Sequence, residues 1–267
     1  MTQDSSTNRV LFITEVGSAA WKMNHPLSDS DRFVCYLMPT KDILRGRMKL
    51  VPNVEYTDPD HYTASEPDIN DVVLDGNSHF SAGSGVGPEK IDRSSHELGK
   101  VVNEVVKNNS NFLFGIYSPI VLNPIQDPSD YMEHGPSDET EWFSTFKYLA
   151  AQCMSKVVYN PINGMAVHNK IKYYDSGKDK GWRREKTART IVRTCNFGIA
   201  VLEGRGFVFD SVPPLGDKES GEVENALVRL KAARDASALP ARPTKEAEDD
   251  LREFLYKTRL ANLEEDE

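Results

Sequence analysis

Two short runs of apolar residues dominate the start of the chain. Residues 9–16 and 33–38 are short apolar runs of β-favouring type, and they end at Gly17 and Pro39. Each run is predicted to be a strand, because β-branched and aromatic residues fit a pleated surface while glycine and proline interrupt it. The loop between the two strands is therefore held at one end of a sheet.

The next stretch changes to polar and turn-forming residues. A third strand is predicted at 51–56, where Pro52 favours an edge position because proline donates no ladder hydrogen bond. Residues 57–89 are rich in Asp, Pro, Ser, Gly and Asn. This composition predicts a long excursion with one short strand at 71–74.

A strand followed by a capped helix is predicted after this excursion. Residues 90–93 have a short strand pattern, and Ser94 to Glu97 form a capping-box pattern that is typical of a helix start. The helix is expected to run to about Asn108. Its apolar face has three- and four-residue spacing and consists of Leu98, Val101, Val102 and Val105.

The second half of the chain has helical periodicity. Apolar residues recur at helical spacing in five segments, which are 141–159, 162–174, 184–202, 219–234 and 245–263. Proline, glycine and acidic residues gather near 122–138, as is common between domains. We therefore predict an α+β protein with a mixed sheet and flanking helices in 1–122 and a mainly helical domain in 123–267.

Length and composition indicate a globular protein without a membrane span. The chain has 267 residues, and no apolar run approaches the ~18 residues that a membrane span needs. Its polar first residues lack the features of a secretory signal, so a cytoplasmic location is expected. Cys35, Cys153 and Cys195 lie far apart in apolar segments, which predicts buried free thiols rather than a zinc site or a disulfide.

Charge is distributed unevenly along the chain. The formal net charge of -9 argues against a protein that coats nucleic acid nonspecifically, because such binding needs a broad basic surface. Residues 170–193 nevertheless contain nine Lys or Arg residues and only three acids. The sequence therefore predicts a local cationic patch on an acidic protein.

The loop between the first two strands carries the strongest chemical pattern. Gly17 and Ser18 follow the first strand, and Asp29 and Asp31 precede the second. Glycine lets backbone amides approach a phosphate, and serine adds a hydroxyl donor. Carboxylates at i and i+2 of an extended segment point the same way and are the hard ligands that Mg²⁺ selects. These residues therefore predict a magnesium-dependent site for phosphoryl or nucleotidyl transfer.

A third carboxylate, expected from a neighbouring strand, is needed to complete such a metal site. Asp92 is the candidate because it lies within a predicted strand directly before a helix. Asp71 and Asp75 are the alternatives.

These motifs resemble those of the DNA polymerase beta nucleotidyltransferase superfamily, in which Gly-Ser, a spacer and Asp-x-Asp lead into a strand. The segment 10–21 with Ser28 to Val34 is similar to the predicted, or RNA-repair-pathway, nucleotidyltransferase subgroup, whose signature couples Gly-Ser-x-Ala-Trp-Gly to Ser-Asp-x-Asp. The similarity continues through Asp92, 95–100, 108–111 and 117–121. Lys22 stands where the subgroup usually has glycine, so the loop is either stiffer or brings an added cation to the phosphates.

Four cationic residues and one tryptophan are further candidates, and the resemblance supports the cationic roles. Lys100 is expected to have a phosphate-binding or structural role, against the alternative of an exposed helix lysine. Lys186, Arg189 and Arg193 share one face of a predicted helix and are expected to bind the triphosphate, against the alternative of a solvated face. Trp21 is expected to be a packing residue, with base stacking as the alternative.

The expected function is a metal-dependent nucleotidyltransferase that uses Mg²⁺ or Mn²⁺. It would transfer a nucleoside monophosphate from a nucleoside triphosphate, such as ATP, to a hydroxyl of RNA, a small molecule or a protein, and would release pyrophosphate. A synthetase of cyclic or linear oligonucleotides would use the same carboxylates. A nucleotide-binding or interaction module of the same fold that has lost catalysis is the third possibility.

Overall fold

Five strands form the sheet of this protein in a computed structural model that describes residues 9–23, 30–46, 79–81, 91–122, 141–177 and 181–265. The strands are β1 (Arg9–Val16), β2 (Ser30–Leu37), β3 (His79–Ser81), β4 (Ile91–Glu97) and β5 (Val121–Leu122). The first strand has the predicted bounds, and the second begins three residues before its predicted start. The predicted strands at 51–56 and 71–74 lie outside the described residues.

The sheet is mixed, as predicted. Its strand order is β3-β4-β2-β1-β5. β2 pairs in parallel with β4, whereas β1 pairs antiparallel with β2 and β5, and β3 pairs antiparallel with β4. The parallel pair brings the starts of β2 and β4, which are far apart in sequence, to the same end of the sheet.

Helices make up most of the remaining described chain. Four of them come from the first half, namely α1 (Gly17–Ala20), α2 (Thr40–Leu44), α3 (Leu98–Val106) and α4 (Ser110–Tyr117). The others are α6 (Glu141–Gln152), η2 (Lys156–Val158), α7 (Tyr159–Asn169), the π-helical turn η3 (Lys170–Asp175), α8 (Trp182–Leu202), η4 (Gly216–Lys218), α9 (Glu219–Ala236) and α10 (Lys245–Glu265). The helical second half is therefore confirmed within these residues.

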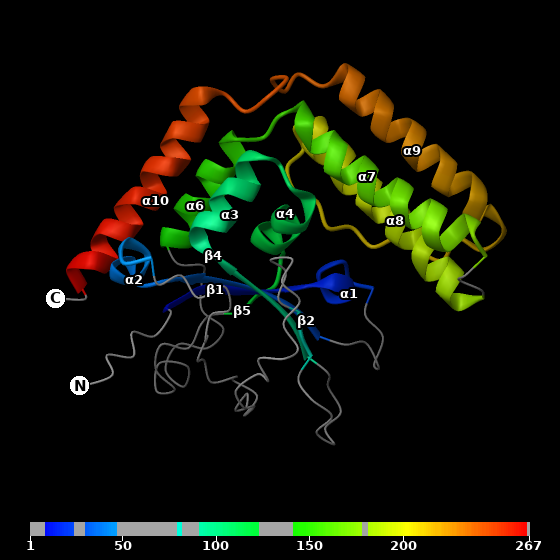
Figure 1. The fold of residues 1–267 in the computed structure, drawn as a ribbon. Helices are drawn as coiled ribbons and strands as arrows, with labels where there is room; N and C mark the ends of the chain where they lie inside the picture. The colour runs from blue at the N-terminus through cyan, green and yellow to red at the C-terminus, as the bar shows by residue number, and fades with distance from the viewer. Residues whose placement is uncertain are drawn as a thin grey trace.

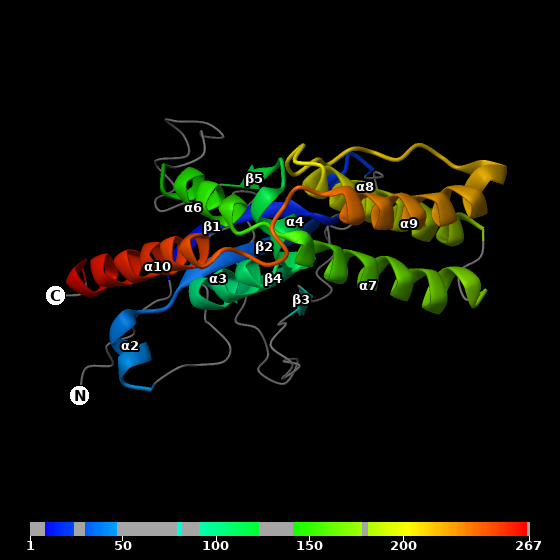
Figure 2. The same cartoon turned by 90° about the horizontal axis from the view of Figure 1, so that it is seen from above.

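The helices form a layer on one face of the sheet (Figure 1). Seen from above, α3, α6 and α10 lie together at one end of this layer, and α7, α8 and α9 lie together at the other (Figure 2). The alternation of β2 matches this arrangement, since Phe33 and Cys35 belong to the main core under the helices, while Val34 belongs to a small cluster on the opposite face.

The hydrophobic core runs across the predicted domain boundary. Phe12 of β1 stacks on Phe143 of α6 with ring centroids 4.1 Å apart. α10 returns to the first half of the chain, where Thr40 donates to the backbone carbonyl of Arg259 over 2.9 Å and Arg259 pairs with Glu97. The division into 1–122 and 123–267 stays a prediction, but helices of the second half complete the core of the sheet.

Asn108 joins α3 to the segment after α6. Its buried side chain donates to the carbonyl of Cys153 over 3.0 Å and accepts hydrogen bonds from the backbone N–H and hydroxyl of Ser155. Ser155 in turn caps η2, since its hydroxyl accepts from the N–H of Val157. For this reason the predicted segment 141–159 is interrupted after Gln152 instead of forming one helix.

The predicted helix start at Ser94 is wrong. Ser94, Ser95, His96 and Glu97 extend β4, because parallel pairing with β2 continues to Glu97. The helix begins only at Leu98, and the Glu97 side chain caps it by accepting from the N–H of Gly99. All four predicted apolar positions of α3 are buried.

The expectation for the cysteines is met within the described chain. Cys35, Cys153 and Cys195 are buried free thiols, and burial raises the pKa of the Cys195 thiol to about 12. Among the residues that the structure describes, no helix combines the length and apolar character that crossing a membrane requires.

Candidate functional site

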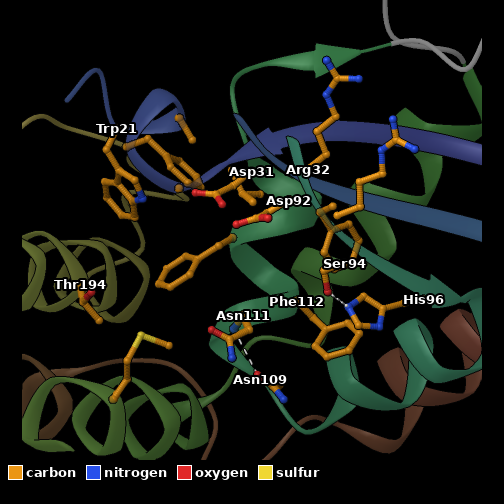
Figure 3. A pocket seen from close by; sticks show the side chains of 18 of the residues that line it. Trp21, Asp31, Arg32, Asp92, Ser94, His96, Asn109, Asn111, Phe112 and Thr194 are labelled. Atoms are coloured by element: carbon orange, nitrogen blue, oxygen red, sulfur yellow. Dashed lines mark hydrogen bonds between the residues drawn. The ribbon is translucent and has the colours of Figure 1, made fainter. Parts of the chain in front are cut away.

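A cleft of about 540 Å³ lies where β2 and β4 begin, between the sheet and the helices α4 and α8 (Figure 3). The turn after β1 and the first turns of α3 and α4 form other parts of its lining. Residues from both halves of the chain meet here, as predicted for the site.

Two carboxylates meet at the sheet side of this cleft. Asp31 and Asp92 are register partners on the parallel strands β2 and β4. Both lie on the face that carries Phe33, and both line the cleft, into which Figure 3 shows them pointing together. The structure therefore brings together two of the three predicted metal ligands. Asp29, the third, and the alternatives Asp71 and Asp75 lie outside the described residues.

The backbone of Gly17 lies directly against the carboxylate of Asp31. Its φ of +64° lies in the left-handed region that glycine adopts readily. A Cβ at this position would lie 2.0 Å from Oδ2 of Asp31, so any side chain would displace the carboxylate. Gly17 lines the cleft, whereas Ser18 follows it in α1 and does not contribute to the lining.

Lys22 completes the turn after α1 in an unusual conformation. Its φ is +53°, and its backbone N–H donates to the carbonyl of Ala19 over 2.8 Å. A non-glycine residue therefore adopts the left-handed conformation at this position. Lys22 is exposed and outside the lining of the cleft.

Arg193 of α8 supplies positive charge opposite the carboxylates. Its guanidinium lies 5.3 Å from the ring centroid of Trp21, and both residues line the cleft. Burial and, to a smaller extent, the neighbouring charge of Arg189 lower the pKa of Arg193 to about 10, while the negative charge of Asp31 opposes this shift. A cation held in this way, partly removed from water, favours an anionic ligand.

Lys100 supplies a second cation from α3. It lines the cleft and lies 6.0 Å from the ring centroid of Phe112, which also lines it. Its place in the first turn of α3 follows from the late start of that helix after β4. Lys100 is therefore half-buried in the cleft and not an exposed helix lysine, and its phosphate-binding or structural role stays a prediction.

Trp21 forms part of an aromatic wall. It is 3% exposed, and its ring lies 4.6 Å from that of Phe209 and 5.6 Å from that of Phe114. The expected packing role is confirmed.

No family model matches the chain, and no curated protein matches it significantly.

Two predicted cations lie elsewhere. Lys186 and Arg189 are on α8 but do not line the cleft. Lys186 is exposed, and Arg189 donates through Nε to the carbonyl of Val212 over 2.7 Å. Helical spacing placed them correctly on the Arg193 side of α8, but only the last of the three cations reaches the carboxylates.

Several polar cleft residues were not predicted. Thr190 and Thr194 line the cleft beside Arg193. Thr190 precedes Arg193 by three residues and Thr194 by four, and these spacings are the signal that places Thr190 on the same helix face as the other two. Asn109 and Asn111 line it at the start of α4, where the Asn109 side chain caps the helix by accepting from the N–H of Asn111. A capping residue before an apolar helical run is a recognisable pattern.

Within the described chain, no three His, Cys, Asp or Glu side chains gather as a metal site. Asp31 and Asp92 provide two carboxylates, and these are the hard oxygen donors that Mg²⁺ and Mn²⁺ prefer. These two donors are part of the ligand set that the sequence predicts, and Asp29, the remaining predicted ligand, lies outside the described residues.

Proposed function

We propose that this chain is a metal-dependent nucleotidyltransferase of the DNA polymerase beta type. It transfers a nucleoside monophosphate from a nucleoside triphosphate to a hydroxyl group and releases pyrophosphate. The observation that supports this most directly is the register pair Asp31 and Asp92, which share one cleft with Gly17 and Arg193.

Asp31 and Asp92 would hold Mg²⁺ or Mn²⁺ together with Asp29. When bound, such ions activate the attacking hydroxyl and neutralise the charge of the triphosphate. Gly17 contributes by leaving space for the Asp31 carboxylate, which any larger residue would fill. The glycine of the loop is thus required for the position of a proposed metal ligand.

Two of the cations that line the cleft would bind the triphosphate from two sides. Arg193 reaches the cleft from α8 and Lys100 from α3, while the carboxylates lie on the sheet. In the reaction, the acceptor oxygen forms a bond to the α-phosphorus, and the bond from that phosphorus to the pyrophosphate oxygen breaks. The hydroxyl proton leaves to a carboxylate oxygen, for which Asp92 is the candidate. Catalysis then consists mainly of positioning and charge neutralisation.

A binding module without catalysis is the less favoured alternative. Loss of the catalytic arrangement would be indicated by an Asp92 remote from the other carboxylates. Asp92 instead pairs in register with Asp31. The retained pair favours an active enzyme.

The direct test is incubation of the full chain with each labelled nucleoside triphosphate and Mg²⁺ or Mn²⁺. RNA, protein extract or no acceptor is added, and products are identified by mass. We expect Asp31→Asn and Asp92→Asn to abolish metal-dependent transfer, because the amide keeps the shape of the side chain and removes its charge. The control Asp217→Asn changes an exposed aspartate of η4 outside the cleft and should retain activity.

Circular dichroism and unfolding curves accompany these assays. Carboxylates gathered without a metal repel each other, so the cleft variants are expected to fold. Wild-type turnover in either variant would show that the metal assignment is wrong.

A further inference from the structure

The face of α8 that leads away from the cleft combines positive charge with an exposed aromatic ring. Trp182, Lys186, Arg189 and Arg193 follow one another at spacings of four, three and four residues. At 3.6 residues per turn, these positions fall within a band of roughly 60° on the helix. They form one stripe, hereafter the α8 stripe, whose last member lines the cleft.

The outer end of the α8 stripe is open to solvent. Trp182 is 69% exposed, which is unusual for the largest apolar side chain. The guanidinium of Arg183 lies 5.6 Å from its ring centroid. Figure 1 shows this end of α8 far from the sheet, at the tip of the group formed with α7 and α9.

Acids near the α8 stripe are occupied by other partners. Glu219 pairs with Arg184, and Glu185 accepts from the backbone N–H of Leu215. Among the described residues, no acid forms an ion pair with Arg183, Lys186 or Arg189. The stripe therefore keeps a net positive charge on a protein whose formal net charge is -9.

We propose that the α8 stripe binds a single-stranded polynucleotide and guides its terminal hydroxyl to the cleft. A cationic track with an aromatic platform is the arrangement that binds single strands, because cations contact phosphates while an unpaired base stacks on the ring. This inference deepens the proposed function and rests on it for the role of the cleft, because it specifies the acceptor.

The length of the α8 stripe sets the expected size of the ligand. Trp182 and Arg193 are eleven residues apart, which corresponds to ~16 Å along a helix. A stacked strand rises ~3.4 Å per nucleotide, so the stripe spans about five nucleotides. A duplex offers no unpaired base to Trp182 and should bind less well.

The test measures binding without catalysis. Fluorescence anisotropy of a labelled oligouridylate of about 12 nucleotides, within the range of known single-strand sites, is recorded with the full chain and no triphosphate. We expect Trp182→Ala and Lys186→Glu each to weaken binding roughly tenfold. Lys257→Glu makes the same charge change on exposed α10 at the opposite end of the helical layer and should leave affinity unchanged.

Salt and length give independent readouts. Each neutralised phosphate contributes about -0.7 to the slope of log affinity against log salt for single strands, so Lys186→Glu should make the slope less steep by at least this amount. Trp182→Ala should no longer reduce the affinity for strands shorter than about five nucleotides. A DNA strand of matching sequence shows whether affinity depends on the sugar. A duplex and an acidic peptide show whether the stripe binds other anionic ligands more tightly.

Failure of this inference is distinguishable from failure of the proposed function. Absence of single-strand binding, or tighter binding of the duplex or peptide, would overturn the inference while transfer to a small acceptor persists. A Lys186→Glu protein that loses triphosphate affinity but keeps oligonucleotide affinity would also overturn it. Strand binding without nucleotide transfer by wild type would instead count against the proposed function and would remove the proposed guidance to the cleft.

Discussion

Replacement of Gly17 by alanine tests the contact on which the carboxylate pair depends. The added Cβ would lie 2.0 Å from Oδ2 of Asp31. Non-bonded atoms are favourably ~3.5 Å apart, so the carboxylate must withdraw by about 1.5 Å or the turn must open. Because displacement by ~1 Å in an active site costs on the order of 100-fold in rate, we expect at least this loss of transfer activity.

The stability cost of Gly17→Ala has two separable parts. Alanine in the left-handed region costs ~1–2 kcal/mol, and forced overpacking costs typically ~1–3 kcal/mol more. Asp31→Ala removes the two closest contacts, which are with Oδ2 and Cγ, but leaves the backbone cost. In a double-mutant cycle measured by urea unfolding, we therefore expect the two changes to be coupled by about 1–3 kcal/mol.

A matched glycine provides the control. Gly204 has φ +72°, and an added Cβ there would meet no described atom within 4 Å beyond its own chain neighbours, so Gly204→Ala should show the backbone cost alone. Additive effects of Gly17→Ala and Asp31→Ala, or full activity of the Gly17→Ala protein, would refute the close fit of the loop around the carboxylate.

Three further substitutions give distinct expectations. Arg193→Met should stabilise the fold by about 1 kcal/mol, because burial disfavours the cation and lowers its pKa to about 10. The same change should weaken triphosphate binding roughly tenfold or more, because it removes a charge that contacts the phosphates. Exposed Arg205→Met is the control, and equal effects of the two substitutions would contradict this expectation. Since its folded pKa lies below its ordinary value, the cost of Arg193 should decline as pH rises through about 10, which unfolding of wild type and Arg193→Met over an alkaline pH series checks. Lys22→Gly should raise the free energy of unfolding by up to ~1 kcal/mol, because glycine tolerates the left-handed φ of +53°. A lower free energy of unfolding in urea would instead show that the lysine side chain stabilises the turn. Asn108→Ala should lower the free energy of unfolding by about 3 kcal/mol, because it leaves buried groups of 153–155 without their hydrogen bonds. Thermal unfolding unchanged from wild type would show that these hydrogen bonds do not stabilise the fold.

Local sequence patterns predicted much of this arrangement. β1 was predictable because it is a run of β-favouring apolar residues that ends at glycine, and α3 because its apolar residues recur at three- and four-residue spacing. The sequence predicted Asp92 only as a ligand from a neighbouring strand. It did not predict that Asp92 lies directly opposite Asp31, because the register of β2 against β4 is not visible in either strand alone.

Patterns that depend on distant partners were less informative. Ser94 to Glu97 have a local helix-start pattern, but pairing with β2 holds them in a strand. Likewise, the spacing of Lys186, Arg189 and Arg193 identifies one helix face without showing where along α8 the cleft ends. The return of α10 to the first half has no local signal at all.

That return makes the order of synthesis important for folding. The hydrogen bonds between Thr40 and Asn262 join residues 222 positions apart. At ~5–20 residues per second, roughly 10 to 45 s pass on the ribosome between the appearance of the two partners. During that interval the apolar surface that later contacts Leu251 of α10 lacks its cover. Chaperones that bind exposed apolar surface therefore have time to engage the nascent chain before α10 emerges and docks.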